Sequence, residues 1–470
     1  MSEAILRDVA SLAIRLAAER GATDAECTIA EGDEFSATVR LGEVETLKEA
    51  GSRAAGLRVL IGKRQGSSYT SDLTDEGVSQ MVDAAIAIAR ITEEDPFAGL
   101  PEREELGQID GDLKLAEADV AQVEASARID AAKRAEATAL GADPRITNSE
   151  GAGCETYTGC RVFANSRGFL GSYSSTTASL SVTPVAREGE QMERDYWHSI
   201  SRSWAGLESP EDVGRKAAAR ALRRLGARKI ETCKATVVFE PRVAKSILGH
   251  IFEAVTGEAI YRKSSFLLDK LNEKIAVDGL TLIDDATMPG FFGTSPFDDE
   301  GVPSRRTVIV ENGVLKNYLY NTYSARKMGA KTTGNGSRGL TGAAGIGHGT
   351  LFIEPGTKTP EEIYAAVGTG LYVTELIGFG VNTVTGDYSR GAAGLWIEDG
   401  KLSYPVAEIT IAGNLSDMLK NIIHIGSDLE FRGSTCAPTI AISEMTISGK
   451  RSPAHQLRRK KSFPPALRLR

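Results

Sequence analysis

Residues 235–250 read Ala-Thr-Val-Val-Phe-Glu-Pro-Arg-Val-Ala-Lys-Ser-Ile-Leu-Gly-His, and this stretch opens the second half of the chain. The run from Ala235 to Phe239 is rich in β-branched and aromatic residues, which indicates a strand. Pro241 comes next, and proline is favoured at the first position of a helix because the N–H it lacks would be unpaired there. We therefore expect a strand that leads directly into a helix, with a domain boundary near residue 230.

The patterns on the two sides of this boundary differ. Before it, the apolar spacing predicts helices and strands in turn: a helix at 3–20, strands at 26–39 and 54–69, a helix from Thr74, an Ala-rich helix at about 115–140, short strands at 145–205 and a helix at 209–225. After it, strands dominate, apart from helices at 241–257 and 360–369. The sequence thus predicts an α+β protein, with an N-terminal α/β domain at 1–230 built on a mixed or antiparallel sheet and a β-rich C-terminal domain at 231–449.

Composition and charge exclude several classes of protein. The chain has no run of 18 apolar residues, so we expect no membrane helix. Its five scattered cysteines favour a reducing, cytoplasmic setting over a disulfide framework. The formal net charge is −8, yet residues 450–470 hold eight Lys and Arg and no acid, so the rest of the chain stands at −16. Direct nucleic-acid binding by such an acidic body is not expected, and the basic tail at 450–470 is predicted to be a disordered extension.

Several long blocks carry a resemblance to a known family. They are Tyr261–Asp269, Asn321–Lys327, Gly368–Gly378, Thr385–Gly394 and Pro405–Leu415, in that order along the chain. With them, the chain resembles the TldD/PmbA (TldD/TldE) metallopeptidases of bacteria and archaea, and among these the PmbA (TldE) type, over roughly residues 1–449. The resemblance implies the same two-part fold, a mixed N-terminal domain followed by a β-rich one.

The resemblance also gives a meaning to residues 245–250. Catalytic, TldD-type members of the family carry His-Glu-x-x-x-His here, two imidazoles for zinc and a carboxylate that acts as general base. In this sequence the three positions are Lys245, Ser246 and His250. A protonated ammonium cannot ligate zinc and would repel it. The resemblance therefore implies no catalytic residue and no cofactor in this chain, with zinc expected in a TldD-type partner.

Remnants of a metal site remain possible ligands. Cys436 lies near the region where catalytic relatives supply a thiolate, so it could remain a neighbour of His250, and Glu253 could add an oxygen on the same helical face. Two or three such ligands fall short of, or barely reach, the usual zinc set, and the alternative is that His250 and Cys436 are partly buried relics. A separate hypothesis pairs the Lys245 ammonium with Glu253 or Glu258 in place of the lost metal charge.

Two glycine-bounded segments are further candidates. Gly386–Gly391 encloses Asp387, Tyr388, Ser389 and Arg390, which would bind peptide backbone or a partner subunit; the alternative is a turn satisfied by its own Asp387–Arg390 pair. The segment 329–349 holds eight glycines and predicts a mobile loop beside a cavity or a plain surface loop, not a dinucleotide site, because no helix follows it. The acids at 284–285 and 298–300 are interpreted as turn residues, and His198, His348 and His424 as structural.

The function that the resemblance implies is that of a zinc-free partner subunit in a heterodimeric TldD/TldE metallopeptidase. Such enzymes cleave unfolded or small peptides, and the family is linked to peptide-antibiotic maturation, to antitoxin degradation and, by name, to modulation of DNA gyrase. Two alternatives stay open. One is an independent metal-dependent peptidase that uses His250 and Cys436. The other is a non-catalytic peptide-binding scaffold, which would form a homodimer when alone.

Overall fold

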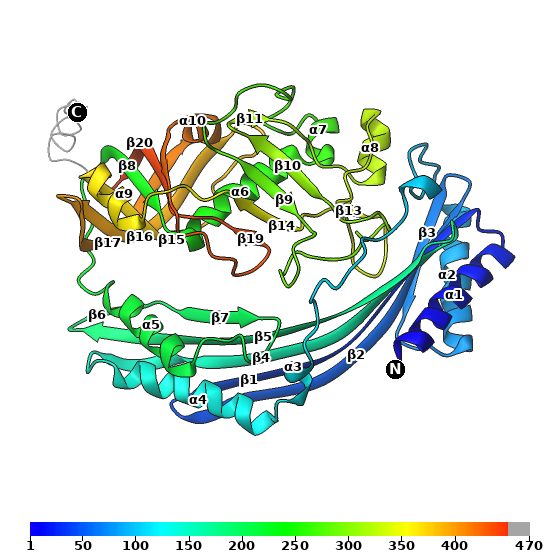
Figure 1. Ribbon diagram of the computed structural model, residues 1–470, viewed down its shortest axis with the longest axis horizontal. Helices are drawn as coiled ribbons and strands as arrows, with labels where there is room; N and C mark the ends of the chain where they lie inside the picture. The colour runs from blue at the N-terminus through cyan, green and yellow to red at the C-terminus, as the bar shows by residue number, and fades with distance from the viewer. Residues whose placement is uncertain (450–470) are drawn as a thin grey trace, which may run out of the picture.

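A computed structural model describes residues 1–449, and the predicted basic tail at 450–470 lies outside these residues. The first half of the chain forms one long antiparallel sheet in the order β3-β2-β1-β4-β5-β6, with β7 also paired to β5. Its strands are β1 (Asp24–Arg40), β2 (Glu43–Ile61), β3 (Arg64–Thr70), β4 (Ile146–Asn165), β5 (Leu170–Glu188), β6 (Gln191–Arg194) and β7 (Trp197–Ser201). Four of these strands have 17 to 20 residues, so the sheet runs along the whole lower side of the molecule in Figure 1.

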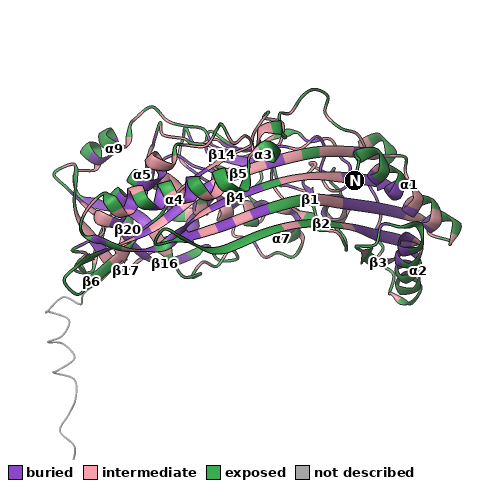
Figure 2. Ribbon diagram, turned by 90° about the horizontal axis from the view of Figure 1, so that it is seen from below, coloured by how far each residue is buried: buried purple, intermediate pink, exposed green. Residues whose placement is uncertain are grey.

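Helices cover the lower, outer side of this sheet at its two ends. At one end α1 (Glu3–Glu19) and α2 (Asp75–Ile91) pack on β1, β2 and β4, and at the other α4 (Ala125–Gly141) and α5 (Pro210–Leu222) pack on β4 and β5. The short helices η1 (Arg103–Glu105) and α3 (Ala118–Gln122) belong to the segment between α2 and α4. Figure 2 shows the exposed outer faces of these helices and, between them, strands in which buried and partly exposed residues alternate, with the first part of β2 exposed.

The strand expected at 54–69 is wrong in its limits. Residues 43–61 and 64–70 are two strands joined by a tight turn, in which Gly62 has a φ of +62°. Residues 43–49 of β2 are exposed, so this part has no buried face and lacks the apolar alternation that reveals a half-buried strand. This part of β2 is a strand because it pairs with β1, residue by residue, and not because of an apolar pattern.

Two smaller sheets make up the second half. One has the order β11-β10-β9-β14-β19, and the other β17-β16-β15-β8-β20-β18, with a further β17–β20 pairing that closes five of its strands into a ring. Their strands are β8 (Cys233–Phe239), β9 (Leu282–Asp285), β10 (Arg306–Glu311), β11 (Val314–Leu315), β14 (Thr350–Ile353), β15 (Gly370–Ile377), β16 (Asp387–Glu398), β17 (Lys401–Asn414), β18 (Ile422–Ile425), β19 (Thr435–Cys436) and β20 (Ile440–Ser448). The predicted fold class, a mixed N-terminal region and a β-rich C-terminal region, is confirmed.

The remaining elements of this half are short. They are α6 (Pro241–Val255), α7 (Gly257–Tyr261), α8 (Thr322–Met328), α9 (Pro360–Val367), α10 (Leu415–Lys420) and a hairpin of β12 (Gly336–Ser337) and β13 (Gly345–Ile346). The helix α6 shares one core with strands of both sheets. No helix of residues 1–449 has the length and apolar character needed to cross a membrane.

The β12–β13 hairpin connects the two halves of the molecule. Arg338, which follows β12 and is 2% exposed, reaches into the long sheet, where its guanidinium pairs with Glu26 and donates to Thr28 Oγ1 at 2.9 Å. Its Cζ also lies 5.1 Å from the centre of the Phe163 ring. Next to it, a Cβ at Gly56 would come within 1.7 Å of the Leu340 carbonyl oxygen, so the hairpin lies directly on the backbone of β2. The hairpin thus holds the two halves together at one end of the space between them.

This contact predicts the effect of an Arg338→Met variant. We expect the free energy of unfolding to fall by about 3 kcal/mol, because a buried carboxylate loses one of its cations. Glu26 keeps its bond to Arg58, 2.7 Å away, which limits the loss. Urea denaturation of both proteins measures the difference. As a control, Arg134→Met removes an exposed pair with Glu211 and should change little; equal losses in both variants would contradict a special role for Arg338.

Candidate functional site

The helix α6 carries the three positions that the sequence marks, and its apolar face decides where they point. Pro241 is the first residue of α6, as predicted, directly after β8 and Glu240. The buried residues of α6 are Val243, Ala244, Ile247, Leu248, Ile251, Ala254 and Val255. Lys245 is exposed, and Ser246 and His250 are half-buried. Positions 245 and 250 differ by about 140° around the helix axis, at 100° per residue, so their side chains leave α6 in different directions.

His250 lies against β16. Its ring is 6.2 Å from that of Tyr388 in an edge-on arrangement, and its Nδ1 is 4.0 Å from Glu253 Oε2. Burial lowers the pKa of His250; Glu253 opposes this shift and Arg390 adds to it. His250 Nε2, Tyr388 Oη and Arg390 Nε are all buried with no hydrogen-bond partner among the described residues. One helix and the strand beside it thus contribute three buried polar atoms without hydrogen-bond partners in the described part of the chain, which is unusual because buried polar groups are normally paired.

The four residues from Asp387 to Arg390 lie on two faces of β16. The turn expected at 386–391 is wrong, because β16 begins at Asp387 and pairs residue by residue with β17. Strand alternation buries Tyr388, while Asp387 and Ser389 are exposed. The Asp387 carboxylate accepts from Thr385 Oγ1 at 2.7 Å, and no ion pair joins it to Arg390 within residues 1–449. Tyr388 and Arg390 therefore accompany His250, whereas Asp387 and Ser389 do not.

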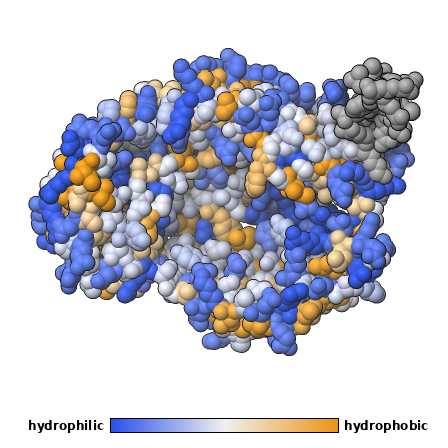
Figure 3. Space-filling model, turned by 180° about the vertical axis from the view of Figure 1, so that it is seen from behind, coloured by the Kyte–Doolittle hydropathy of each residue, from blue (hydrophilic) through white to orange (hydrophobic). Residues whose placement is uncertain are grey.

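Lys245 and Cys436 share a cavity of about 220 Å³ between the two halves of the molecule. It is lined by β7, α5, the start of α6, β15 and the segment from 428 to 437. Cys436 is 3% exposed, and its thiol donates to the Gly433 carbonyl at 3.4 Å. Burial raises the pKa of this thiol, and the Arg432 backbone and Lys245 only partly offset the shift. The space-filling view from behind shows the molecule hollowed between its two halves (Figure 3).

These positions do not fit a zinc ion. No hydrogen bond joins His250 to Cys436, and no group of three or more His, Cys, Asp or Glu side chains within residues 1–449 is placed to hold a metal. The Ser246 hydroxyl donates to the Val243 carbonyl at 2.7 Å, so it is engaged with its own helix. Lys245 does not pair with the two expected acids, since Glu253 lies beside His250 and Glu258 pairs with Arg262. That the chain holds no zinc, and that a TldD-type partner holds it instead, stays a prediction.

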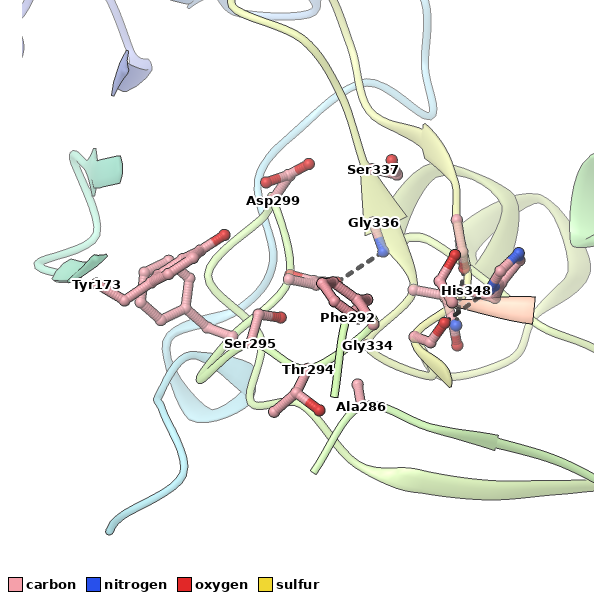
Figure 4. A pocket seen from close by; sticks show the side chains of 17 residues that line it. Tyr173, Ala286, Phe292, Thr294, Ser295, Asp299, Gly334, Gly336, Ser337 and His348 are labelled. Atoms are coloured by element: carbon pink, nitrogen blue, oxygen red, sulfur yellow. Dashed lines mark hydrogen bonds between the residues drawn. The ribbon is translucent and has the colours of Figure 1, made fainter. Parts of the chain in front are cut away.

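The glycine-rich segment borders a second cavity, of about 290 Å³ (Figure 4). Residues 334–337 and 347–349 of this segment line it, opposite Tyr173 of β5 and the residues from 292 to 299. The close-up shows Ser295, Asp299 and the Phe292 ring around the space, with His348 on the far side. His348 Nε2 lies 3.2 Å from Thr435 Oγ1, so β19 separates this cavity from the one at Lys245. Of the two alternatives for this segment, the structure agrees with a loop beside a cavity, and the predicted mobility of the loop stays a prediction.

The interpretation of the acids at 284–285 and 298–300 as turn residues is wrong for most of them. Asp284 and Asp285 are buried at the end of β9, and Asp298 and Glu300 are buried beside this cavity. Asp298 accepts from the N–H groups of Glu300, Val302 and Gly336, and Glu300 accepts from Thr322. Burial raises the pKa of Asp298 to about 7 and that of Glu300 to about 8, and the mutual repulsion of the two carboxylates contributes to the second shift. Sequence reasoning missed them because Asp and Glu near glycine are typical of exposed turns, and only the packing of Gly336 against both side chains buries them.

This pair predicts a pH dependence of stability. The folded pKa of Glu300 is raised from 4.5 to about 8, so its contribution to stability is complete below 4.5 and is lost as the pH rises through about 8. A Glu300→Gln variant cannot ionise there and should lose less stability over this range. Urea denaturation at several pH values tests this, with Glu49→Gln, an exposed acid, as control. Identical pH profiles for wild type and Glu300→Gln would contradict a raised pKa of Glu300 in the folded protein.

His198 provides a second, local prediction. Burial, then Arg242, Arg432 and Lys245, lower its pKa from 6.5 to about 4, against a small opposing effect of Glu208. Replacing Lys245 with Met removes one of these cations, so we expect the pKa of His198 to rise. NMR titration of the imidazole measures this, and Lys401→Met at the exposed start of β17 is the control. An unchanged pKa in Lys245→Met would place Lys245 too far from His198 to act on it.

Comparison with known proteins agrees with this fold throughout its length. Models of the PmbA/TldA metallopeptidase match the chain as domain 1 at residues 25–89, as the central domain at 118–225 and as the C-terminal domain at 232–449. The metalloprotease PmbA of Escherichia coli O157:H7 is 42% identical over 95% of this chain and 96% of its own. The PmbA homologue of Haemophilus influenzae is 39% identical over 94% and 96%.

Solved structures extend the likeness to three dimensions. The crystal structure of a modulator of DNA gyrase from Bacteroides thetaiotaomicron superposes with a TM-score of 0.88 at 31% identity, over 94% of this chain and 98% of that one. TldE from Thermococcus kodakarensis has the same fold, with a TM-score of 0.83 at 22% identity and coverage of 94% and 100%. With all three family domains matched in order and near-complete relatives above 30% identity, this chain belongs to the PmbA (TldE) group of the TldD/PmbA metallopeptidase family.

Proposed function

We propose that this chain is the non-catalytic subunit of a heterodimeric peptidase, in which a TldD-type partner holds the zinc and this chain helps to hold the peptide. The observation that carries the proposal is the set of side chains that α6 presents at the three motif positions. Lys245 and Ser246 occupy the positions of the first histidine and the general base of the catalytic relatives, and His250 is turned toward Tyr388. When bound in the partner, zinc would polarise the scissile carbonyl and activate water. None of that chemistry is assigned to residues of this chain.

The space between the two halves supports a peptide-holding role. β7 pairs only with β5, and β19 only with β14, so each strand has one edge without a strand partner among the described elements. The outer edge of β7 faces the second half, because the His198 carbonyl accepts from Arg432 Nη1 at 3.0 Å. An extended peptide can add to such strand edges through backbone hydrogen bonds, which recognise any unfolded sequence. This mode of binding suits a peptidase of unfolded or small peptides.

The independent-peptidase alternative has weaker support. It requires His250 and Cys436 to act on one metal or one substrate atom, yet His250 lies against β16 and Cys436 borders the cavity at Lys245. The scaffold alternative, with this chain acting alone or as a homodimer, is a distinct outcome of the experiment below. For the heterodimer we infer a cytoplasmic location, supported by five free cysteines, and substrates such as peptide-antibiotic precursors and antitoxins.

Purification with and without the partner tests the proposal. We expect the chain alone to contain far less than one zinc per molecule and to cleave no unstructured peptide. Co-expressed with a TldD-type protein of the same host, it should form a one-to-one complex that contains zinc and cleaves peptides. Metal analysis, size measurement and a peptide-cleavage assay provide the readouts, with the TldD-type protein alone as control.

Two results would contradict the proposal. Near-stoichiometric zinc and peptidase activity in the lone chain would favour the independent enzyme. A stable homodimer that does not bind the TldD-type protein would favour the scaffold alternative.

A further inference from the structure

The cavity at Lys245 has a charge pattern that no part of the proposed mechanism uses. It holds about 220 Å³ and is lined by residues of both halves. Four cations border it: Arg220, Arg242, Lys245 and Arg432. The three arginines are all paired: Arg220 and Arg242 with Asp195 and Glu240, and Arg432 with Glu208 and Glu430. The Lys245 ammonium has no ion pair or hydrogen bond with any residue from 1 to 449.

The acids that border the same cavity do not balance Lys245. Glu240 is 5% exposed and is held by Arg220, Arg223 and Arg242. Asp428 directs both carboxylate oxygens at Thr439, accepting from its N–H at 2.9 Å and from its hydroxyl at 2.7 Å. Glu430 pairs with Arg432 at 2.7 Å. The ammonium of Lys245 is therefore the one charge in the described cavity wall without a partner of opposite sign or a hydrogen bond.

Two neighbours of Lys245 show what kind of ligand fits. His198 is held neutral by burial and by the surrounding cations, so the local potential disfavours any added positive charge. Trp197 lines the cavity as an aromatic wall, and Arg432 lies 4.6 Å from the centre of its ring. The cavity thus combines a free cation, a positive potential and an apolar surface. A small anion attached to an apolar group meets all three features.

We propose that this cavity binds a carboxylate of the peptide substrate, with the Lys245 ammonium as its partner and Trp197 beside the neighbouring side chain. The proposal deepens the peptide-holding role and rests on it. A charge-assisted hydrogen bond to the Lys245 ammonium stabilises the complex and fixes one point of the peptide. The carboxylate belongs either to the C-terminus of the peptide or to an acidic side chain. In both cases Lys245 acts as an anchor at a position where catalytic relatives carry a metal ligand.

Binding of small carboxylates to the full chain tests this without any partner. The probes are N-acetylalanine, N-acetylalaninamide and N-acetylglutamic acid α-amide, which offer a C-terminal carboxylate, no carboxylate and a side-chain carboxylate. Tryptophan fluorescence follows binding, because Trp197 lines the site. We expect each carboxylate to bind about ten-fold more tightly than the neutral amide, from one charge-assisted hydrogen bond. The tighter of the two carboxylates identifies the natural source.

Three variants make the test specific. Lys245→Met should remove the preference for carboxylates while leaving the melting temperature unchanged, since Lys245 is exposed and unpaired within residues 1–449. Lys245→Arg should retain most of the preference, because it keeps the charge. Lys401→Met, at the exposed start of β17 and outside the cavity lining, should behave as wild type. The proposal is overturned if carboxylate and amide bind alike, if none of the probes binds, or if Lys245→Met keeps the preference.

A second measurement separates this proposal from the proposed function. In the complex with a TldD-type protein, Lys245→Met should raise KM for peptides with the preferred carboxylate and leave kcat unchanged. Failure to form an active complex would contradict the heterodimer while the titration of the lone chain still decides the carboxylate site. If the complex is active but its KM changes neither with Lys245→Met nor with removal of the carboxylate from the peptide, only the carboxylate site is overturned.

Discussion

The burial of one face of α6 against strands of both C-terminal sheets is the constraint on which the site depends. Seven apolar residues of this helix enter the core, and a helix can bury one side only by turning the others elsewhere. Lys245 is thereby directed into the space between the two halves of the molecule, and His250 toward Tyr388 on β16. Lys245 and His250, although five residues apart on one helix, thus lie in two separate environments. A change in the apolar face of α6 would move both.

The space that Lys245 enters exists because the two halves touch at a few places instead of through a continuous apolar interface. One of these places is aromatic, where Phe297 packs on Phe163 of β4 and on Phe169 directly before β5. The hydrophobic clusters of the described residues stay within one half each, whereas Arg338, Arg161 and Arg202 cross between them. Arginine suits this task because its planar guanidinium forms several directed bonds and also stacks on an aromatic ring. These few contacts leave cavities between the halves, and the short strand β19 lies between the one at Lys245 and the one beside the glycine-rich segment.

Sequence patterns performed well wherever local rules decide the structure. The strand-to-helix junction at 239–241 and the overall α+β division followed from β-branched runs, proline position and helical spacing. They failed at 43–53, where β2 is exposed on both sides, and at 387–390, where glycines suggested a turn but pairing with β17 makes a strand. They also failed at Asp298 and Glu300, whose burial depends on the distant residues 334–337. In each case a long-range contact overrides the local signal.

The sequence by itself determined the family, the fold class and the loss of two motif side chains at 245 and 246, because these are properties of residue identity and spacing along the chain. Only the tertiary structure decided which of the marked residues share a site. It separated His250 from Cys436, placed Lys245 among paired arginines beside Trp197, and divided the residues from 387 to 390 between two faces of a strand. The physical reason is that neighbourhood in space is set by which surfaces are buried together, and no spacing within one segment records what the opposite side of a cavity will contribute.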